Sequence, residues 1–174
     1  MPSDQPASTA DAPRPLAAGE WPLLKRLRLA ALADAPDAFS PTLEEAQAHP
    51  DAYWRAWAER AQEPGSRVFV APSGGEPAGL VSAVRNDDGV GHIGAMWVGP
   101  RARRAHLGRR LLRRGCDFLV AAGCTRIVLT VTETNAAAIA MYRGEGFALT
   151  GRSQPLRAGS PLANLEMAWE LPPS

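Results

Sequence analysis

Apolar residues recur with two different spacings along the chain, and the change of spacing separates predicted helices from predicted strands. Over residues 20–62 they recur every three or four positions, which is typical of amphipathic helices. This spacing predicts a helix over residues 20–33, a second that Ser40 caps and a third after Pro50. Tyr53, Trp54 and Trp57 lie three and four positions apart in the third helix, which favours core packing.

Shorter apolar runs between Gly, Pro, Asn and Asp residues predict strands. They cover residues 67–71, 78–84, 93–98, 126–131, 148–152 and 165–171. Helical spacing returns at Leu107, and an alanine-rich run that Thr134 or Asn135 can cap and Gly146 can end predicts a last helix. This order of elements predicts an α/β fold in which a mixed sheet carries helices on both faces.

The chain has 174 residues, which favours a single domain with a sizeable core. Residues 1–14 have almost nothing apolar to bury, so we expect a disordered or extended tail before one domain over residues 15–172. No apolar run approaches a membrane span and no signal peptide is visible, so we expect a cytoplasmic protein without membrane contact. Cys116 and Cys124 should be reduced core residues, and the scattered histidines predict no metal.

Seven arginines lie between Arg101 and Arg114, around the predicted amino end of the Leu107 helix, with no acidic residue among them. A helix amino end already carries partial positive charge and unpaired N–H groups, so cations there repel it unless an anion lies between them. A phosphate or pyrophosphate would resolve this conflict. The simpler alternative is that arginine is the surface cation of this protein, since Lys25 is its one lysine.

The same segment contains an ordered set of residues. A strand ends at Val98-Gly99-Pro100, the loop Arg103-Arg104-Ala105-His106-Leu107-Gly108 follows, and the helix continues with Leu111-Leu112. This pattern resembles the acetyl-coenzyme A signature of the GNAT superfamily of N-acetyltransferases. One position departs from it, because His106 replaces the usual first glycine and its Cβ narrows the conformations open to the loop.

A second motif lies one strand further on. It reads Asn135-x-x-Ala138-x-x-x-Tyr142-x-x-x-Gly146-Phe147 and is similar to the other GNAT signature at every anchor position. Two motifs in this order are far more specific than either alone. The resemblance implies a GNAT-type sheet of six to seven mostly antiparallel strands, and an N-acetyltransferase that uses acetyl-CoA as co-substrate and attacks it directly with a primary amine.

The resemblance also implies site residues. The pantetheine arm of acetyl-CoA would enter between the strands of residues 93–98 and 126–131. The implied cofactor-binding residues are Trp97, Val98, Arg103, Arg104, Ala105, His106, Leu107, Gly108, Arg109, Asn135, Ala138 and Tyr142. A neutral phenol can donate a proton to a departing thiolate, which makes Tyr142 the catalytic acid. Glu133 is the first candidate for the base, followed by Glu44, Glu45 and His92.

Several functional questions stay open at this level. The resemblance implies a small-molecule or peptide amine as acceptor, and small amines, amino acids, antibiotics and protein amino termini all fit. Residues 32–59 and 152–163 would select it, with an aromatic side chain of the third helix as one wall. A non-catalytic acyl-CoA-binding module and a nucleic-acid-binding domain that uses the Arg101 to Arg114 cluster are the alternatives. The net charge is only +1, whereas nucleic-acid-binding proteins are more often basic throughout, so we expect no nucleic-acid partner. The family resemblance is compatible with a homodimer.

Overall fold

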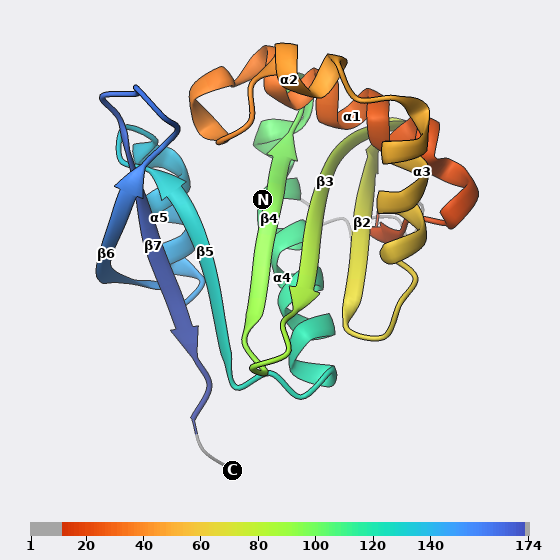
Figure 1. The fold of residues 1–174 in the computed structure, drawn as a ribbon. Coiled ribbons are helices and arrows are strands. Elements are labelled where there is room, and N and C mark those ends of the chain that lie inside the picture. Colours follow the sequence, from red (N-terminus) through yellow and green to blue (C-terminus); the bar gives the residue numbers. More distant parts are fainter. Residues whose placement is uncertain (1–11, 173–174) are drawn as a thin grey trace, which may run out of the picture.

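A seven-stranded sheet forms the centre of the molecule (Figure 1). The computed structural model describes residues 12–172, apart from the side chains of Arg104 and Ala105. The strands are β1 (Arg14–Pro15), β2 (Ser66–Ser73), β3 (Glu76–Arg85), β4 (Gly91–Val98), β5 (Arg126–Thr132), β6 (Ala148–Pro155) and β7 (Ala163–Glu170). Their order is β1-β2-β3-β4-β5-β7-β6, and all neighbours are antiparallel except β4 and β5. The predicted mixed, mostly antiparallel sheet is confirmed.

Helices cover both faces of this sheet, as predicted (Figure 1). One face carries α1 (Trp21–Asp34), α2 (Leu43–Gln47) and α3 (Asp51–Arg60), and the other carries α4 (Leu107–Ala121) and α5 (Ala136–Gly144). Side chains of a strand alternate between faces, so Val68 and Val70 enter the core under α1 to α3 while Phe69 and Ala71 enter the core under α4 and α5. The sheet therefore separates two hydrophobic cores.

Most predicted elements are found within a few residues of their expected bounds, and one local prediction needs correction. Thr42 caps α2 in place of Ser40, because its hydroxyl accepts the Glu45 N–H at 3.2 Å and the Glu45 carboxylate accepts the Thr42 N–H at 2.8 Å. Arg14, the last residue of the expected tail, is extended in β1 and pairs with Glu20 at 2.8 Å. The expectation for residues 1–11 falls outside the described residues.

Smaller predictions agree with the structure. Asn135 caps α5 by accepting the Ala138 N–H, and Gly146, with a φ of 100°, follows the end of that helix. Cys116 and Cys124 are buried free thiols. Of the three aromatic residues predicted to pack in the core, Trp54 is fully buried and Trp57 is partly buried against the same core, whereas Tyr53 is 37% exposed and does not fit the prediction. Within the described residues, no helix is long and apolar enough to span a bilayer.

The parallel strands β4 and β5 separate soon after they meet. They pair only at Gly91 with Ile127 and at His92 with Val128, and they diverge towards their carboxyl ends (Figure 1). A β-bulge coincides with the divergence: β4 has one residue more than β3 between the Gly94 and Trp97 pairings, and the φ of Ala95 is 51°. Bulges bend a strand and increase its twist, which carries this part of β4 away from β5.

Close packing of β3 against β4 and α4 holds this bent strand in place. A Cβ added at Gly79 would lie 2.8 Å from the Trp97 carbonyl oxygen and 3.0 Å from Cδ1 of Leu111. We expect Gly79→Ala to lower the free energy of unfolding by about 1–3 kcal/mol in urea denaturation, because backbone cannot give way cheaply. Gly94→Ala is the matched control on β4, since nothing lies within 4 Å of its added Cβ. Equal stability of the two variants would contradict this packing.

Candidate active site

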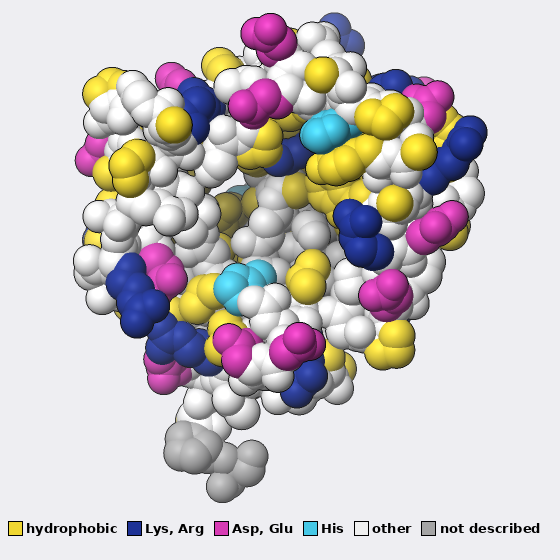
Figure 2. Space-filling view, viewed as in Figure 1, with side chains coloured by type: hydrophobic (Ala, Val, Ile, Leu, Met, Phe, Trp, Pro, Cys, Tyr) yellow, Lys and Arg dark blue, Asp and Glu magenta, His cyan; other side chains and the backbone are white. Residues whose placement is uncertain are grey.

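A cavity of about 920 Å³ lies where β4 and β5 part. Its wall is formed by α1 and the segment that follows it, by β4 and β5, and by the first turn of α4 and one side of α5. In the space-filling view the molecule is hollowed here, with hydrophobic side chains along part of the rim (Figure 2). The cavity thus connects the two faces of the sheet.

The structure brings most of the predicted cofactor-binding residues to this cavity. Those that line it are Trp97, Val98, Arg103, His106, Gly108, Arg109, Asn135, Ala138 and Tyr142. Leu107 does not line it, because its side chain is 1% exposed within the core under α4. The side chains of Arg104 and Ala105 lie outside the described part of the structure. The two sequence motifs therefore converge on one site.

The turn before α4 has an unusual backbone conformation at His106. A 3₁₀ helix over Pro100–Ala105 ends there, and His106 has φ 54° and ψ 21°, in the left-handed region. Glycine enters this region freely, whereas other residues do so at a cost. The backbone at His106 thus has a conformation that glycine adopts easily. The Cβ of His106 does not prevent it. No side chain caps the amino end of α4, so its first N–H groups are available to an anion.

Acidic residues from elsewhere in the chain reach several of the clustered arginines. Asp34, at the end of α1, is paired with Arg103 and accepts the Trp97 Nε1–H at 3.0 Å. Glu145, beyond α5, contacts Arg109 at 3.4 Å and Arg113 at 2.7 Å. The cluster is therefore partly neutralised within the fold, although its sequence contains no acid.

Tyr142 presents a buried phenol to the cavity. Its side chain is 6% exposed, and burial, together with the nearby Cys116, raises the pKa of Tyr142 to about 12. No described residue makes a hydrogen bond with its hydroxyl. The group is consequently neutral at physiological pH and its proton is available for donation.

The predicted base does not reach the cavity. Glu133 accepts the Ala163 N–H at 2.9 Å and is not part of the cavity wall. Glu45 is engaged in the α2 cap, and the His92 ring contacts Asn86 at 2.7 Å. Asp34 is the one carboxylate among the described lining residues. Sequence reasoning missed it because it lies at the end of α1, outside both motifs.

Comparison with known proteins agrees with this geometry. Residues 29–147, more than half of the chain, match the acetyltransferase (GNAT) family. The chain belongs to the GNAT acetyltransferase family. An IAA acetyltransferase of Azospirillum brasilense is 37% identical over 94 residues, which cover 53% of this chain and 61% of that protein. A mycothiol acetyltransferase of Thermobifida fusca (strain YX) is 32% identical over 143 residues, or 75% of this chain and 40% of that protein.

The chain thus matches less than two thirds of the length of both curated GNAT relatives. Among solved structures, yncA of Salmonella typhimurium, determined with its cofactor acetyl-CoA, is similar with a TM-score of 0.78. The match covers 94% of this chain and 95% of that one at 22% identity, which shows a shared fold.

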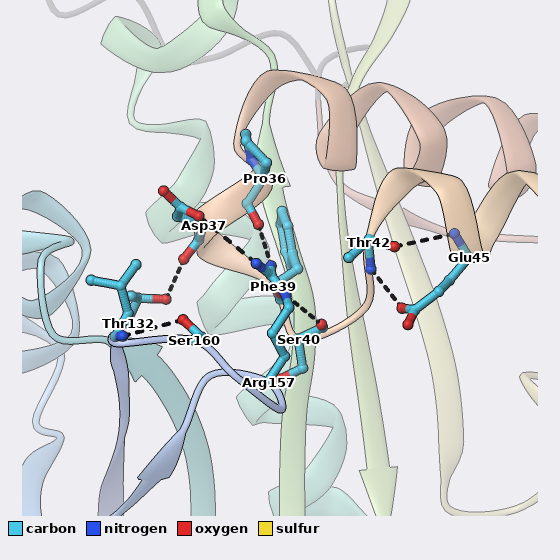
Figure 3. Close-up of polar contacts among 10 residues, drawn as sticks. Pro36, Asp37, Phe39, Ser40, Thr42, Glu45, Thr132, Arg157 and Ser160 are labelled. Atoms are coloured by element: carbon cyan, nitrogen blue, oxygen red, sulfur yellow. Dashed lines mark hydrogen bonds and ion pairs between the residues drawn. The ribbon is translucent and has the colours of Figure 1, made fainter.

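A clamp outside the GNAT motifs fixes the segment between α1 and α2 (Figure 3). Arg157, in the loop between β6 and β7, donates to the carbonyl oxygens of Pro36 at 2.6 Å, Phe39 at 2.7 Å and Ser40 at 3.1 Å. Thr132, at the end of β5, donates its hydroxyl to the Asp37 carbonyl at 2.5 Å. The two regions expected to select the acceptor are therefore in direct contact beside the cavity.

The aromatic wall that was predicted from α3 is not found at the cavity. None of Tyr53, Trp54 and Trp57 lines the cavity. Trp57 instead lies under Arg28 of α1, which does line it. Arg28 carries no motif, and the one signal for it was a cation inside the apolar stripe of Leu24, Leu27 and Ala31.

The backbone at His106 leads to a test of the GNAT loop. We expect His106→Gly to raise the free energy of unfolding by up to about 1 kcal/mol and His106→Val to lower it by about 1–2 kcal/mol, because β-branched residues fit the left-handed region worst. Chemical denaturation measures both. Arg101, in the 3₁₀ helix before His106, is exposed and its φ is not positive, so glycine should instead lower stability there. The same response at both positions would be inconsistent with a left-handed His106.

Proposed function

We propose that this chain is an N-acetyltransferase that transfers the acetyl group of acetyl-CoA to a primary amine by direct attack within a ternary complex. The observation that carries the proposal is the parting of β4 and β5 around a cavity that joins both faces of the sheet. Such a passage lets the two substrates approach from opposite sides and meet between the strands.

Three features fit acetyl-CoA on the side of α4 and α5. The amino end of α4 lacks a side-chain cap and lies among arginines, which suits a pyrophosphate. Beyond His92, β4 has no strand partner on the β5 side, and amides of a pantetheine arm can satisfy such backbone groups. Gly108 and Ala138 line the cavity, and their small size leaves room for the cofactor along that part of the wall.

The proposed reaction is acyl transfer from a thioester, which acetyl-CoA supplies. The amine nitrogen forms a bond to the acetyl carbonyl carbon, the carbon–sulfur bond breaks, and one amine proton leaves. The carbonyl oxygen gains negative charge as the bond forms, and an unpaired β4 N–H near Val98 is the proposed donor that stabilises it.

Tyr142 is the proposed partner of the departing sulfur. Its pKa of about 12 lies well above the value of about 8.5 for a thiol, so complete proton transfer to the thiolate is uphill. A hydrogen bond from the phenol, which strengthens as charge develops on sulfur, is the role that this pKa favours. Cys116 is not a competing nucleophile, because burial raises its pKa to about 12.

Asp34 is the proposed recipient of the amine proton, in preference to Glu133. It lines the cavity from α1, whereas the Glu133 carboxylate is bound to the β7 backbone. Its ion pair with Arg103 must loosen before the carboxylate is free to contact the amine. An incoming phosphate is a competing partner for Arg103.

Calorimetric titration with acetyl-CoA tests the binding part of the proposal. We expect micromolar affinity, and at least tenfold weaker binding by Gly108→Asp than by the isosteric Gly108→Asn, because the added anion opposes the phosphates. Both side chains would meet Met141 and Met96, which are flexible, so the pair isolates charge. Equal affinities would move the phosphates away from α4, and absence of acetyl-CoA binding by the parent protein would refute the function.

Turnover of an amine panel with detection of free CoA thiol tests the role of Tyr142. Tyr142→Phe should lower kcat at least several-fold and leave acetyl-CoA affinity nearly unchanged, since only the hydrogen bond to sulfur is lost. The protonated phenol is the active form and persists below its raised pKa, so the ratio of the two rates should stay constant from pH 7 to 10. Equal rates in the two proteins would remove Tyr142 from catalysis.

A further inference from the structure

Arg28 is a cation at the inner wall of the cavity. It projects from α1 among the buried residues Leu24, Leu27 and Ala31, and its own side chain is about nine-tenths buried, with 9% exposed. It lines the cavity together with Phe39, Ser40 and Pro41 of the clamped segment after α1. It therefore borders the side of the cavity that lies opposite the α4 amino end.

No described carboxylate lies within ion-pairing distance of this guanidinium. Its Nη1 atom is fully buried without a hydrogen-bond partner among the described residues, and the guanidinium carbon lies over ring faces, at 4.7 Å from the Phe39 centroid and 6.0 Å from the Trp57 centroid. Burial lowers the pKa of Arg28. A buried guanidinium that keeps N–H groups unsatisfied is unfavourable for folding alone.

The contrast with other arginines is informative. Arginines that pair with a carboxylate in the described residues are Arg14, Arg103, Arg109, Arg113, Arg126 and Arg157. All of them are more exposed than Arg28, although exposed arginines need partners least. The other two arginines of the cavity wall, Arg103 and Arg109, are both in this paired group. Arg28 thus offers the unmatched positive charge of the wall.

We propose that Arg28 binds a carboxylate of the acceptor, so that the substrate is an amino acid or another small amine that also carries a carboxylate. This inference rests on the proposed acetyl transfer. A planar fork of N–H donors matches a carboxylate, and one unpaired guanidinium suits a single negative charge better than a phosphate dianion. The Phe39 and Trp57 rings pack against the guanidinium, and Arg157 donates a hydrogen bond to the Phe39 carbonyl.

The sheet also contributes polar groups to the wall of this cavity. Thr130 of β5 and Asn164 of β7 line the same cavity, and Asn164 is 5% exposed. Neither side chain has a hydrogen-bond partner in the described residues. They can orient the amine or the carboxylate, while Phe39 and Pro41 favour an apolar side chain on the acceptor.

Matched substrate pairs test the inference. Alanine, leucine, methionine and phenylalanine are each compared with their α-carboxamides, by acetyl-CoA-dependent turnover and by thermal-shift binding. We expect the parent protein to prefer at least one acid over its amide by tenfold to a hundredfold in kcat/KM, roughly the effect of a charge-assisted hydrogen bond. Amidation lowers the amine pKa and leaves more neutral amine, so this preference would run against intrinsic reactivity.

Arg28→Met should abolish the preference, with loss of binding of the acid and little change for the amide. Arg26→Met, at an exposed position of the same helix, is the control and should retain it. Because Arg28→Met removes an unsatisfied buried cation, its melting temperature should equal or exceed that of the parent. An identical acid-to-amide ratio in the parent and Arg28→Met proteins, in turnover and in binding, would overturn the inference. Acetyl-CoA titration is unaffected by that result and reports separately on the proposed function.

Discussion

The loss of backbone pairing between β4 and β5 is the constraint on which the rest of the structure depends. A strand in the middle of a sheet normally satisfies its N–H and C=O groups on both sides, and unpaired groups are costly unless water or a ligand replaces the partner. Here pairing stops after His92 and Val128. The separation persists because each strand is held from its other side, β4 by its long pairing with β3 and β5 by pairing with β7 along its whole length. The two halves of the sheet act as independent supports for one opening.

Two cores on opposite faces make this opening asymmetric. The α4 and α5 core extends across both halves of the sheet, from Phe69 of β2 to Met167 of β7. The core under α1 to α3 includes strand residues of the first half, such as Val68, Val70 and Leu80, and does not extend to β5 or β7. On that face the two halves are joined by polar contacts instead, from Arg157 and Thr132 to the segment after α1. Polar bridges over a cavity can hold a loop without filling the space beneath it.

The sequence was most informative where chemistry requires a fixed local spacing. The two GNAT motifs located Gly108, Asn135 and Tyr142 at one cavity, because each motif lies next to a strand that forms the opening. Hydrophobic spacing predicted the helices and strands because such spacing depends only on residues close together in the sequence. The Thr42 cap was misassigned to Ser40 even though the Thr-x-x-Glu spacing of a capping box was visible.

Long-range pairings were beyond the reach of such patterns. Asp34 is 69 positions from Arg103 and Arg157 is 118 positions from Phe39, so nothing in the local sequence connects them. The same holds for Arg28, whose position in an apolar stripe could equally have meant a cation whose stem reaches out to solvent. The two arginines differ in their surroundings. Arg103 forms an ion pair with an acid, whereas Arg28 contacts ring faces and has no ionic partner among the described residues. A buried cation without an ionic partner at the wall of a cavity is better explained by a ligand than by folding, since folding alone would favour an apolar side chain of similar size at that position.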